Sequence, residues 1–143
     1  MPQESIFGPV AALVALTFLV LLLIPIKRFR AGAAGEITGE DFRFGESARV
    51  PGHVSIPNRN YMNLLELPML FYVLCLALYV THTVTPLEYG LAWAYVALRA
   101  AHSAVHLTMN HIYTRLTIFA LSNVVLIVAW VMFFVGLFAS HHP

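Results

Sequence analysis

The stretch Arg59-Asn60-Tyr61-Met62-Asn63-Leu64-Leu65-Glu66-Leu67-Pro68 joins a guanidinium, an amide and a carboxylate to the start of an apolar run. At helical spacing, Arg59, Asn63 and Glu66 share one face of a predicted helix. Because an ionisable group at membrane depth is costly, it usually faces protein or a wet cavity. We therefore expect this polar stripe to bind a ligand. The simpler alternative is that Glu66 only pairs with an arginine inside the protein.

The composition indicates an integral membrane protein. Of 143 residues, 59% are hydrophobic and only 10% are charged, whereas a soluble domain carries about 25% charged residues. A net charge of +1 gives no support for a nucleic-acid partner. The single cysteine, Cys75, excludes an intrachain disulfide and is interpreted as a packing residue. The N-terminus lacks the basic region of a secretory signal peptide, so none is expected.

Four apolar stretches predict four membrane spans, each close to the ~20 residues that a membrane helix needs. We expect them at about residues 7–26, 62–80, 87–109 and 116–138. The run Lys27-Arg28-Phe29-Arg30 should end the first span, and a cytoplasmic loop should follow to residue 61. The prediction is an all-α fold, an integral membrane four-helix bundle that forms one domain over residues 1–143.

Basic residues predict the orientation of the bundle. Six of the eight lie in or beside the first loop, namely Lys27, Arg28, Arg30, Arg43, Arg49 and Arg59. Arg115 lies in the third predicted loop. The positive-inside rule then places these two loops in the cytoplasm and both termini outside it. The polar groups of the second span and Arg115 should therefore meet at one depth.

A second polar stripe runs along the third span, where Arg99, His102, His106 and Asn110 share a face. Two histidines at this spacing suggest a metal or haem, but no further ligand is expected at the same depth, so no metal site is predicted. Two interpretations stay open: these histidines hydrogen-bond within the bundle, or they contact a ligand directly. Arg115 likewise either snorkels at the interface or stabilises a nearby thiolate.

These residues resemble the MAPEG family, the membrane-associated proteins of eicosanoid and glutathione metabolism. The resemblance covers nearly the whole chain and is sharpest at Arg59-x-x-x-Asn63-x-x-Glu66 and at Arg99-x-x-His102-x-x-x-His106, followed by Arg115. It departs from the family pattern where Leu67 and His106 replace tyrosines. The sequence is similar to members of a bacterial branch of the family, and this resemblance implies a location in the bacterial inner membrane.

The resemblance implies a homotrimer with ligand sites between protomers, and it implies glutathione as co-substrate. Arg115 is then the catalytic residue that holds the glutathione thiolate. The residues implied to bind glutathione are Arg28, Arg59, Asn63, Glu66, Arg99, His102 and His106. Two functions follow as hypotheses. The first is a membrane glutathione-dependent transferase or peroxidase that acts on hydrophobic electrophiles or lipid hydroperoxides. The second is a non-catalytic lipid-binding or scaffolding protein of the same fold.

Overall fold

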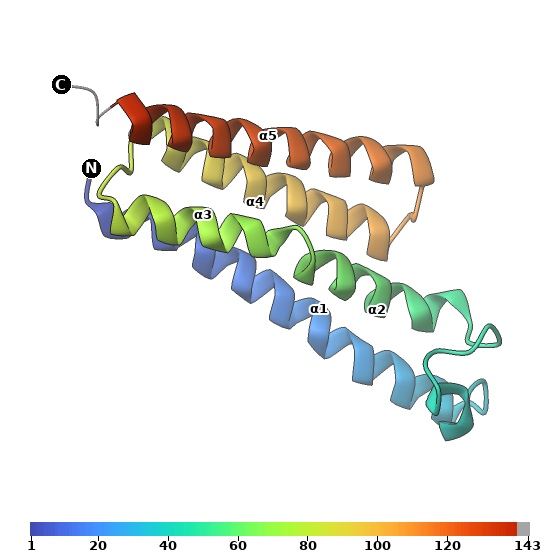
Figure 1. Ribbon diagram of the computed structural model, residues 1–143. Coiled ribbons are helices and arrows are strands. Elements are labelled where there is room, and N and C mark those ends of the chain that lie inside the picture. Colours follow the sequence, from blue (N-terminus) through green and yellow to red (C-terminus); the bar gives the residue numbers. More distant parts are fainter. Residues whose placement is uncertain (140–143) are drawn as a thin grey trace.

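A computed structural model describes residues 1–139, which form helices and no strand (Figure 1). Two short 3-10 helices, η1 (Gln3–Ile6) and η2 (Gly39–Phe42), accompany five α-helices. The α-helices are α1 (Phe7–Ala33), α2 (Gly52–Leu65), α3 (Pro68–Val80), α4 (Pro86–Leu107) and α5 (Ile112–Ala139). Helices α2 and α3 follow one another as two segments of one broken element, so the architecture is a four-helix bundle (Figure 1).

Helix α1 does not end at the basic run but continues to Ala33. Lysine and arginine are good helix formers, so their charge ends a membrane span without ending a helix. The helix ends where Gly35 takes a φ of 74°. There the N–H of Glu36 donates to the carbonyl of Ala31 at 2.9 Å, and the N–H of Gly35 donates to Gly32 at 3.0 Å. This is a Schellman cap, which favours glycine at the left-handed position.

The second span is broken, whereas the sequence predicted one helix over residues 62–80. Helix α2 begins at Gly52, within the predicted loop, and ends at Leu65, while α3 begins at Pro68. Proline has no N–H to donate, and inside a continuous helix its ring would clash with the carbonyl four residues earlier, here that of Leu64. Glu66 follows α2 with a φ of −74° and a ψ of −95°. The break therefore lies inside the stretch that carries the predicted binding residues.

Helices α4 and α5 form an antiparallel pair close to the predicted third and fourth spans. Thr85 and Glu88 form a capping box at the start of α4, with Pro86 at its first position. The chain reverses after α4 at Asn110, whose φ is 46°, a conformation that asparagine tolerates better than most residues. Helix α5 then starts at Ile112, earlier than predicted, which places Arg115 in its first turn.

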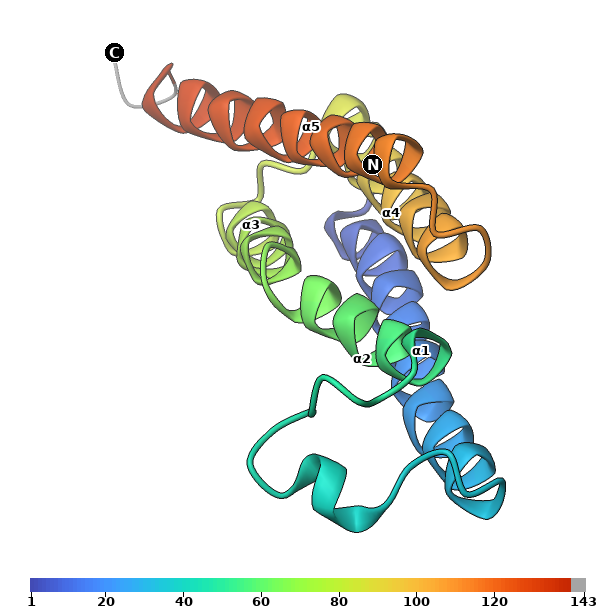
Figure 2. The ribbon, with the colours of Figure 1, turned by 90° about the vertical axis from the view of Figure 1, so that its right-hand side faces the viewer.

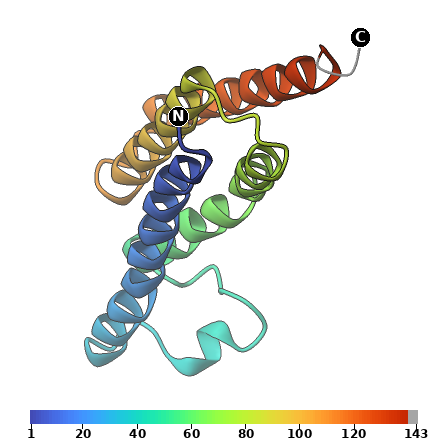
Figure 3. The same ribbon diagram turned by 90° about the vertical axis from the view of Figure 1, so that its left-hand side faces the viewer.

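The packing of the helices brings two distant loops to one end of the bundle. Helix α4 packs chiefly on α5, and α1 packs chiefly on α2. The α1–α2 and α4–α5 loops lie at one end, while the N-terminus and the α3–α4 loop lie at the other (Figure 1). The α1–α2 loop stands out to one side of the bundle (Figures 2 and 3). This common end is the place where the predicted site residues can meet.

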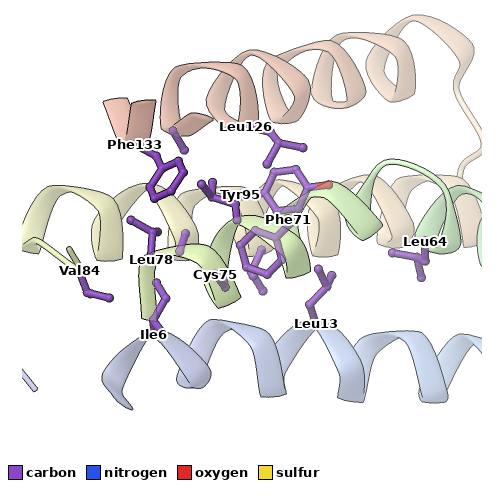
Figure 4. Close-up of a cluster of buried hydrophobic side chains, with 14 of the residues drawn as sticks. Ile6, Leu13, Leu64, Phe71, Cys75, Leu78, Val84, Tyr95, Leu126 and Phe133 are labelled. Carbon is purple, nitrogen blue, oxygen red and sulfur yellow. The ribbon is translucent and has the colours of Figure 1, made fainter. Parts of the chain in front are cut away.

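The buried core occupies the opposite, apolar part of the bundle. The rings of Phe71 and Tyr95 stack at a centroid distance of 4.9 Å, between Leu13 of α1 and Leu126 of α5 (Figure 4). Three helical stretches in the described part of the chain are long and apolar enough to cross a membrane: 3–33, 52–80 and 112–139. Helix α4, the predicted third span, is not among them. Its 22 residues are long enough, about 33 Å at 1.5 Å per residue, but its buried polar stripe makes it less apolar than the other three.

The α1–α2 loop has an ordered centre of its own. Asp41 is 5% exposed and accepts hydrogen bonds from the N–H of Thr38 at 2.9 Å and the hydroxyl of Ser47 at 3.0 Å. Arg49 adds an ion pair at 3.0 Å. A small apolar cluster lies beneath, made of Ala31, Ile37, Val50 and Val54, with Phe42 packed against it. The loop is therefore a folded cap on the end of α1 and α2.

Candidate functional site

Two cavities adjoin at the loop end of α2, α4 and α5. The larger one, called here the polar cavity, has a volume of about 360 Å³, and the smaller one, called here the inner cavity, about 230 Å³. The polar cavity is lined by Ile56, Asn58, Arg59, Met62, Asn63, His106, Asn110 and Arg115. The inner cavity is lined by Asn63, His102, Ile112, Arg115, Leu116 and Phe119. Asn63 and Arg115 belong to both, so these two residues mark the boundary between the cavities.

Arg115 lies at this boundary because α5 begins three residues before it. Its Nη1 donates a hydrogen bond to Oδ1 of Asn110 at 2.7 Å. Asn110 is the left-handed residue of the preceding turn, so the turn itself aims the guanidinium. One side of Arg115 faces a polar lining and the other faces Ile112, Leu116 and Phe119. A permanent cation is thereby held between a polar cavity and a partly apolar one.

The lining of both cavities contains arginine but no carboxylate. Arg59 and Arg115 make no ion pair with any side chain in residues 1–139. Arg59 is exposed at the mouth of the polar cavity. Two cations without a neutralising partner favour an anionic ligand. Arginine in particular presents a planar fork that matches a carboxylate.

Arg99 lies inside the bundle rather than on a cavity wall. Its side chain is 0% exposed, and its Nη2 donates a hydrogen bond to the carbonyl of Asn63. Its guanidinium also lies 5.3 Å from the centre of the Phe119 ring. Its Nε and Nη1 are buried without a hydrogen-bond partner. Arg99 therefore touches the backbone beneath the site.

The two histidines of α4 occupy different positions. Nδ1 of His102 lies 3.1 Å from the carbonyl oxygen of Arg115. Since a carbonyl only accepts, Nδ1 carries the proton in this contact. Nε2 of His102 is buried and has no partner, whereas His106 lines the polar cavity. Among the described residues, no group of three His, Cys, Asp or Glu side chains could hold a metal ion.

Glu66 and Arg28 lie away from these cavities within one chain. The break after Leu65 interrupts the face that would have placed Glu66 beside Asn63, and Glu66 is exposed. It lines neither cavity. Arg28 forms an ion pair with Glu46 at 3.5 Å and lies over the ring of Phe42 at 4.3 Å. Of the residues predicted to bind glutathione, the structure thus brings Arg59, Asn63, His102 and His106 together with Arg115.

Phe119 and Asn58 are two of the lining residues that the sequence analysis did not predict; the others are Ile56, Met62, Ile112 and Leu116. Phe119 lines the inner cavity one helical turn after Arg115, at a spacing of four residues that places both on one face. That spacing is the signal that could have found it. Asn58 lines the polar cavity from α2, but its sequence position was assigned to a loop, so no face could be attributed to it.

The fold and the site together define a helical membrane protein with a cationic, partly apolar cavity at one end of its bundle. The MAPEG family model matches residues 6–135, and the chain belongs to this family. No curated protein and no solved structure gives a significant match. The resemblance found in the sequence and the predicted all-α membrane class are both confirmed. The family includes glutathione transferases and peroxidases as well as non-catalytic members.

Proposed function

We propose that this protein is a membrane-embedded, glutathione-dependent transferase or peroxidase that acts on hydrophobic electrophiles or lipid hydroperoxides. The observation that carries the proposal is the position of Arg115 between the polar and inner cavities, without any carboxylate in either lining. Glutathione is anionic and would place its carboxylates near Arg59. Its sulfur would then reach Arg115, at the edge of an apolar compartment.

The chemistry follows from this placement. Arg115 stabilises the thiolate, and the thiol proton passes to water. In the transferase reaction, the thiolate forms a carbon–sulfur bond with the electrophile, and the leaving group departs with the electrons of its bond. In the peroxidase reaction, two glutathione molecules are oxidised to the disulfide while the hydroperoxide is reduced to an alcohol and water. The protein contributes charge stabilisation and the placement of both reactants.

The proposal extends to the assembly and its orientation. A homotrimer would place residues of a neighbouring protomer beside the cavities, and exposed Glu66 is available to take the glutathione amine across that boundary. Arg28 stays a predicted glutathione-binding residue on the family resemblance alone, whereas the complete burial of Arg99 favours an indirect role over the direct contact that the resemblance implies. The basic α1–α2 loop supports a cytoplasmic position for the cavities, and we propose the bacterial inner membrane as the location. Crosslinking that yields dimers or tetramers without trimers would contradict the assembly.

An alternative function is supported by a separate observation. A cavity of about 460 Å³ lies between α1, α2 and α3, and its lining is almost wholly apolar. Phe18, Tyr61, Leu64 and Met69 are among its walls. An acyl chain would fit such a surface, so a non-catalytic lipid-binding protein of the same fold would use this cavity and need no thiolate.

Glutathione binding separates the two functions. Purified protein should gain thermal stability in millimolar glutathione and should conjugate a chromogenic aryl halide. The matched control is Arg43→Gln, which removes an arginine from the α1–α2 loop and should bind and react as the wild type does. A protein that shows neither a thermal shift nor conjugation, yet gains stability with a fatty acid, would reverse the preference.

A further inference from the structure

We propose that Arg99 and His102 are positioning residues, through which α4 holds the backbone of Asn63 and of Arg115 and so fixes the distance between the two residues that both cavities share. This inference rests on the proposed function for the identity of the ligand only. The contacts that carry it lie within the protein: Arg99 donates to the carbonyl of Asn63, and His102 donates to the carbonyl of Arg115.

Arg99 compensates for the break between α2 and α3. The N–H of Glu66 donates back to Met62 at 3.1 Å, and the next donation, from Met69, goes to Glu66 at 3.2 Å. The carbonyl of Asn63 thus lies at the open C-terminal end of α2, where a helix carries partial negative charge. A buried arginine satisfies that carbonyl and complements the charge. Asn63 is fixed in the wall of both cavities as a result.

His102 acts in the same way on the other wall. The carbonyl of Arg115 belongs to the first turn of α5, and the ring N–H of His102 reaches it from the neighbouring helix. Because the contact is made to the backbone, it sets the position of the turn from which the Arg115 side chain extends. Helix α4 therefore hydrogen-bonds to the backbone of both α2 and α5 through two side chains that lie three residues apart.

Phe119 completes this arrangement. Its ring lies 5.6 Å from the ring of His102 and 5.3 Å from the guanidinium of Arg99, measured to ring centres. The same ring lines the inner cavity. A cation over an aromatic face is attracted to it. The apolar wall of the site is thus packed on the two residues that hold its polar wall.

The remaining polar atoms of these two side chains are buried within one chain, which favours a positioning role, although the His102 ring also lies in the wall of the inner cavity. Nε2 of His102 and both Nε and Nη1 of Arg99 are covered by protein. Of the two interpretations that the sequence left open for His102, the geometry points to hydrogen bonding within the bundle.

Two substitutions of His102 test the inference in the full-length protein. The amide nitrogen of asparagine reaches the position of Nδ1, so His102→Asn keeps the donor, whereas His102→Leu removes it. Hydrogen–deuterium exchange of residues 108–119 without ligand reports on the first turn of α5. Glutathione affinity by calorimetry reports on the site. Tyr95→Phe on the same helix is the matched control, because the Tyr95 hydroxyl is buried without a partner.

We expect His102→Leu to speed exchange in the first turn of α5 and to raise the dissociation constant for glutathione about tenfold, the worth of one hydrogen bond. Tyr95→Phe should match the wild type in both measurements, and His102→Asn should keep wild-type exchange and lose less affinity than His102→Leu. Should His102→Leu fail to fold, His102→Gln replaces it and should behave in the same way, because its amide reaches the position of Nε2 instead.

Unchanged exchange in His102→Leu would overturn the inference. An affinity loss in His102→Asn as large as that in His102→Leu, with normal exchange, would also overturn it, because the backbone contact would then be intact while binding is lost. A wild-type protein that does not bind glutathione would contradict the proposed function, and the exchange measurement would still test the role of His102 alone.

Discussion

Two groups of arginines lie at the same end of this bundle, and they differ in their partners. All ion pairs within residues 1–139 lie in or beside the α1–α2 loop: Arg43–Glu40 and Arg49–Asp41 within it, Arg28–Glu46 from the end of α1 and His53–Glu36 from the start of α2. Around the cavities, Arg59, Arg99 and Arg115 have no such partner within residues 1–139. Arginines of the first group are already neutralised and serve the loop. The arginines of the second group are not neutralised by a carboxylate, so each is available to bind a backbone carbonyl or a ligand.

The largest expected effect belongs to Arg115. Arg115→Ala should lower the rate of aryl-halide conjugation roughly a hundredfold to a thousandfold, the usual cost of removing one group that stabilises developing or bound negative charge. Steady-state kinetics of purified protein measure it. The melting temperature without ligand should change little, because Arg115 is only half-buried and bonds to a turn residue. Full activity in this variant would remove Arg115 from the mechanism.

Arg59 should affect binding more than turnover. We expect Arg59→Ala to weaken the binding of glutathione by about 1.5–3 kcal/mol, the contribution of a hydrogen bond to a charged group. This corresponds to roughly a tenfold to hundredfold rise in the dissociation constant. Calorimetric titration measures this. Glutathione affinity equal to that of the wild type would show that the unpaired arginine at the cavity mouth serves another purpose.

Glu66 tests whether a carboxylate near this site is structural. It is exposed and makes no ion pair in the described part of the chain. Glu66→Gln should therefore change the stability of the apo protein by no more than about 0.5 kcal/mol, as surface substitutions do. Under the proposed function, Glu66→Gln should weaken the binding of glutathione by about 1.5 kcal/mol, the low end for a hydrogen bond to a charged group. A large fall in the melting temperature of the apo protein, with unchanged affinity for glutathione, would show that Glu66 stabilises the fold and does not bind the ligand.

Asp41 provides a pH test of the loop. The N–H of Thr38, then the Ser47 hydroxyl and more weakly Arg49, hold the pKa of Asp41 below its ordinary value. A lowered pKa means that the carboxylate stabilises the loop above pH ~3.9, and that this stabilisation is lost as the pH falls through the lower, folded value. A nitroxide label at Ala48→Cys, in a Cys75→Ala background, should stay ordered at neutral pH and become mobile only in that acid range.

Asp41→Asn is the control for this measurement, because it lacks the titrating group. The label should be mobile at every pH in that variant. A label that loosens near neutral pH in the Asp41 protein would show that another group orders the loop.

The smallest effect is expected from Arg43. Its ion pair with Glu40 spans 3.4 Å between two well-exposed side chains, and exposed pairs of this kind contribute little. Arg43→Gln should leave melting temperature, glutathione affinity and conjugation rate unchanged within error. A loss of affinity would show that paired loop arginines also reach the ligand, and the contrast between the two groups would no longer hold.

The sequence was informative wherever a property depends on spacing along a helix. Hydropathy predicted four apolar stretches, and the positions of Arg59, Asn63 and Arg115 predicted their meeting at one end. Spacing cannot show what a side chain touches, so it could not reveal that Arg99 and His102 bond to backbone carbonyls of α2 and α5. The break after Leu65 was missed because Pro68 was treated as part of a continuous helix. The pairing of Arg28 with Glu46 depends on the folded loop, which composition alone does not predict.

The break between α2 and α3 has a consequence for the response of the protein to its bilayer. A continuous helix that crosses a thicker or thinner membrane adapts by tilting along its whole length. Here α3 can tilt with the lipid while α2, held by Arg99 at its end, keeps its place against α4. We therefore expect a change in membrane thickness to alter the cavities less than it would if the second span were one continuous helix.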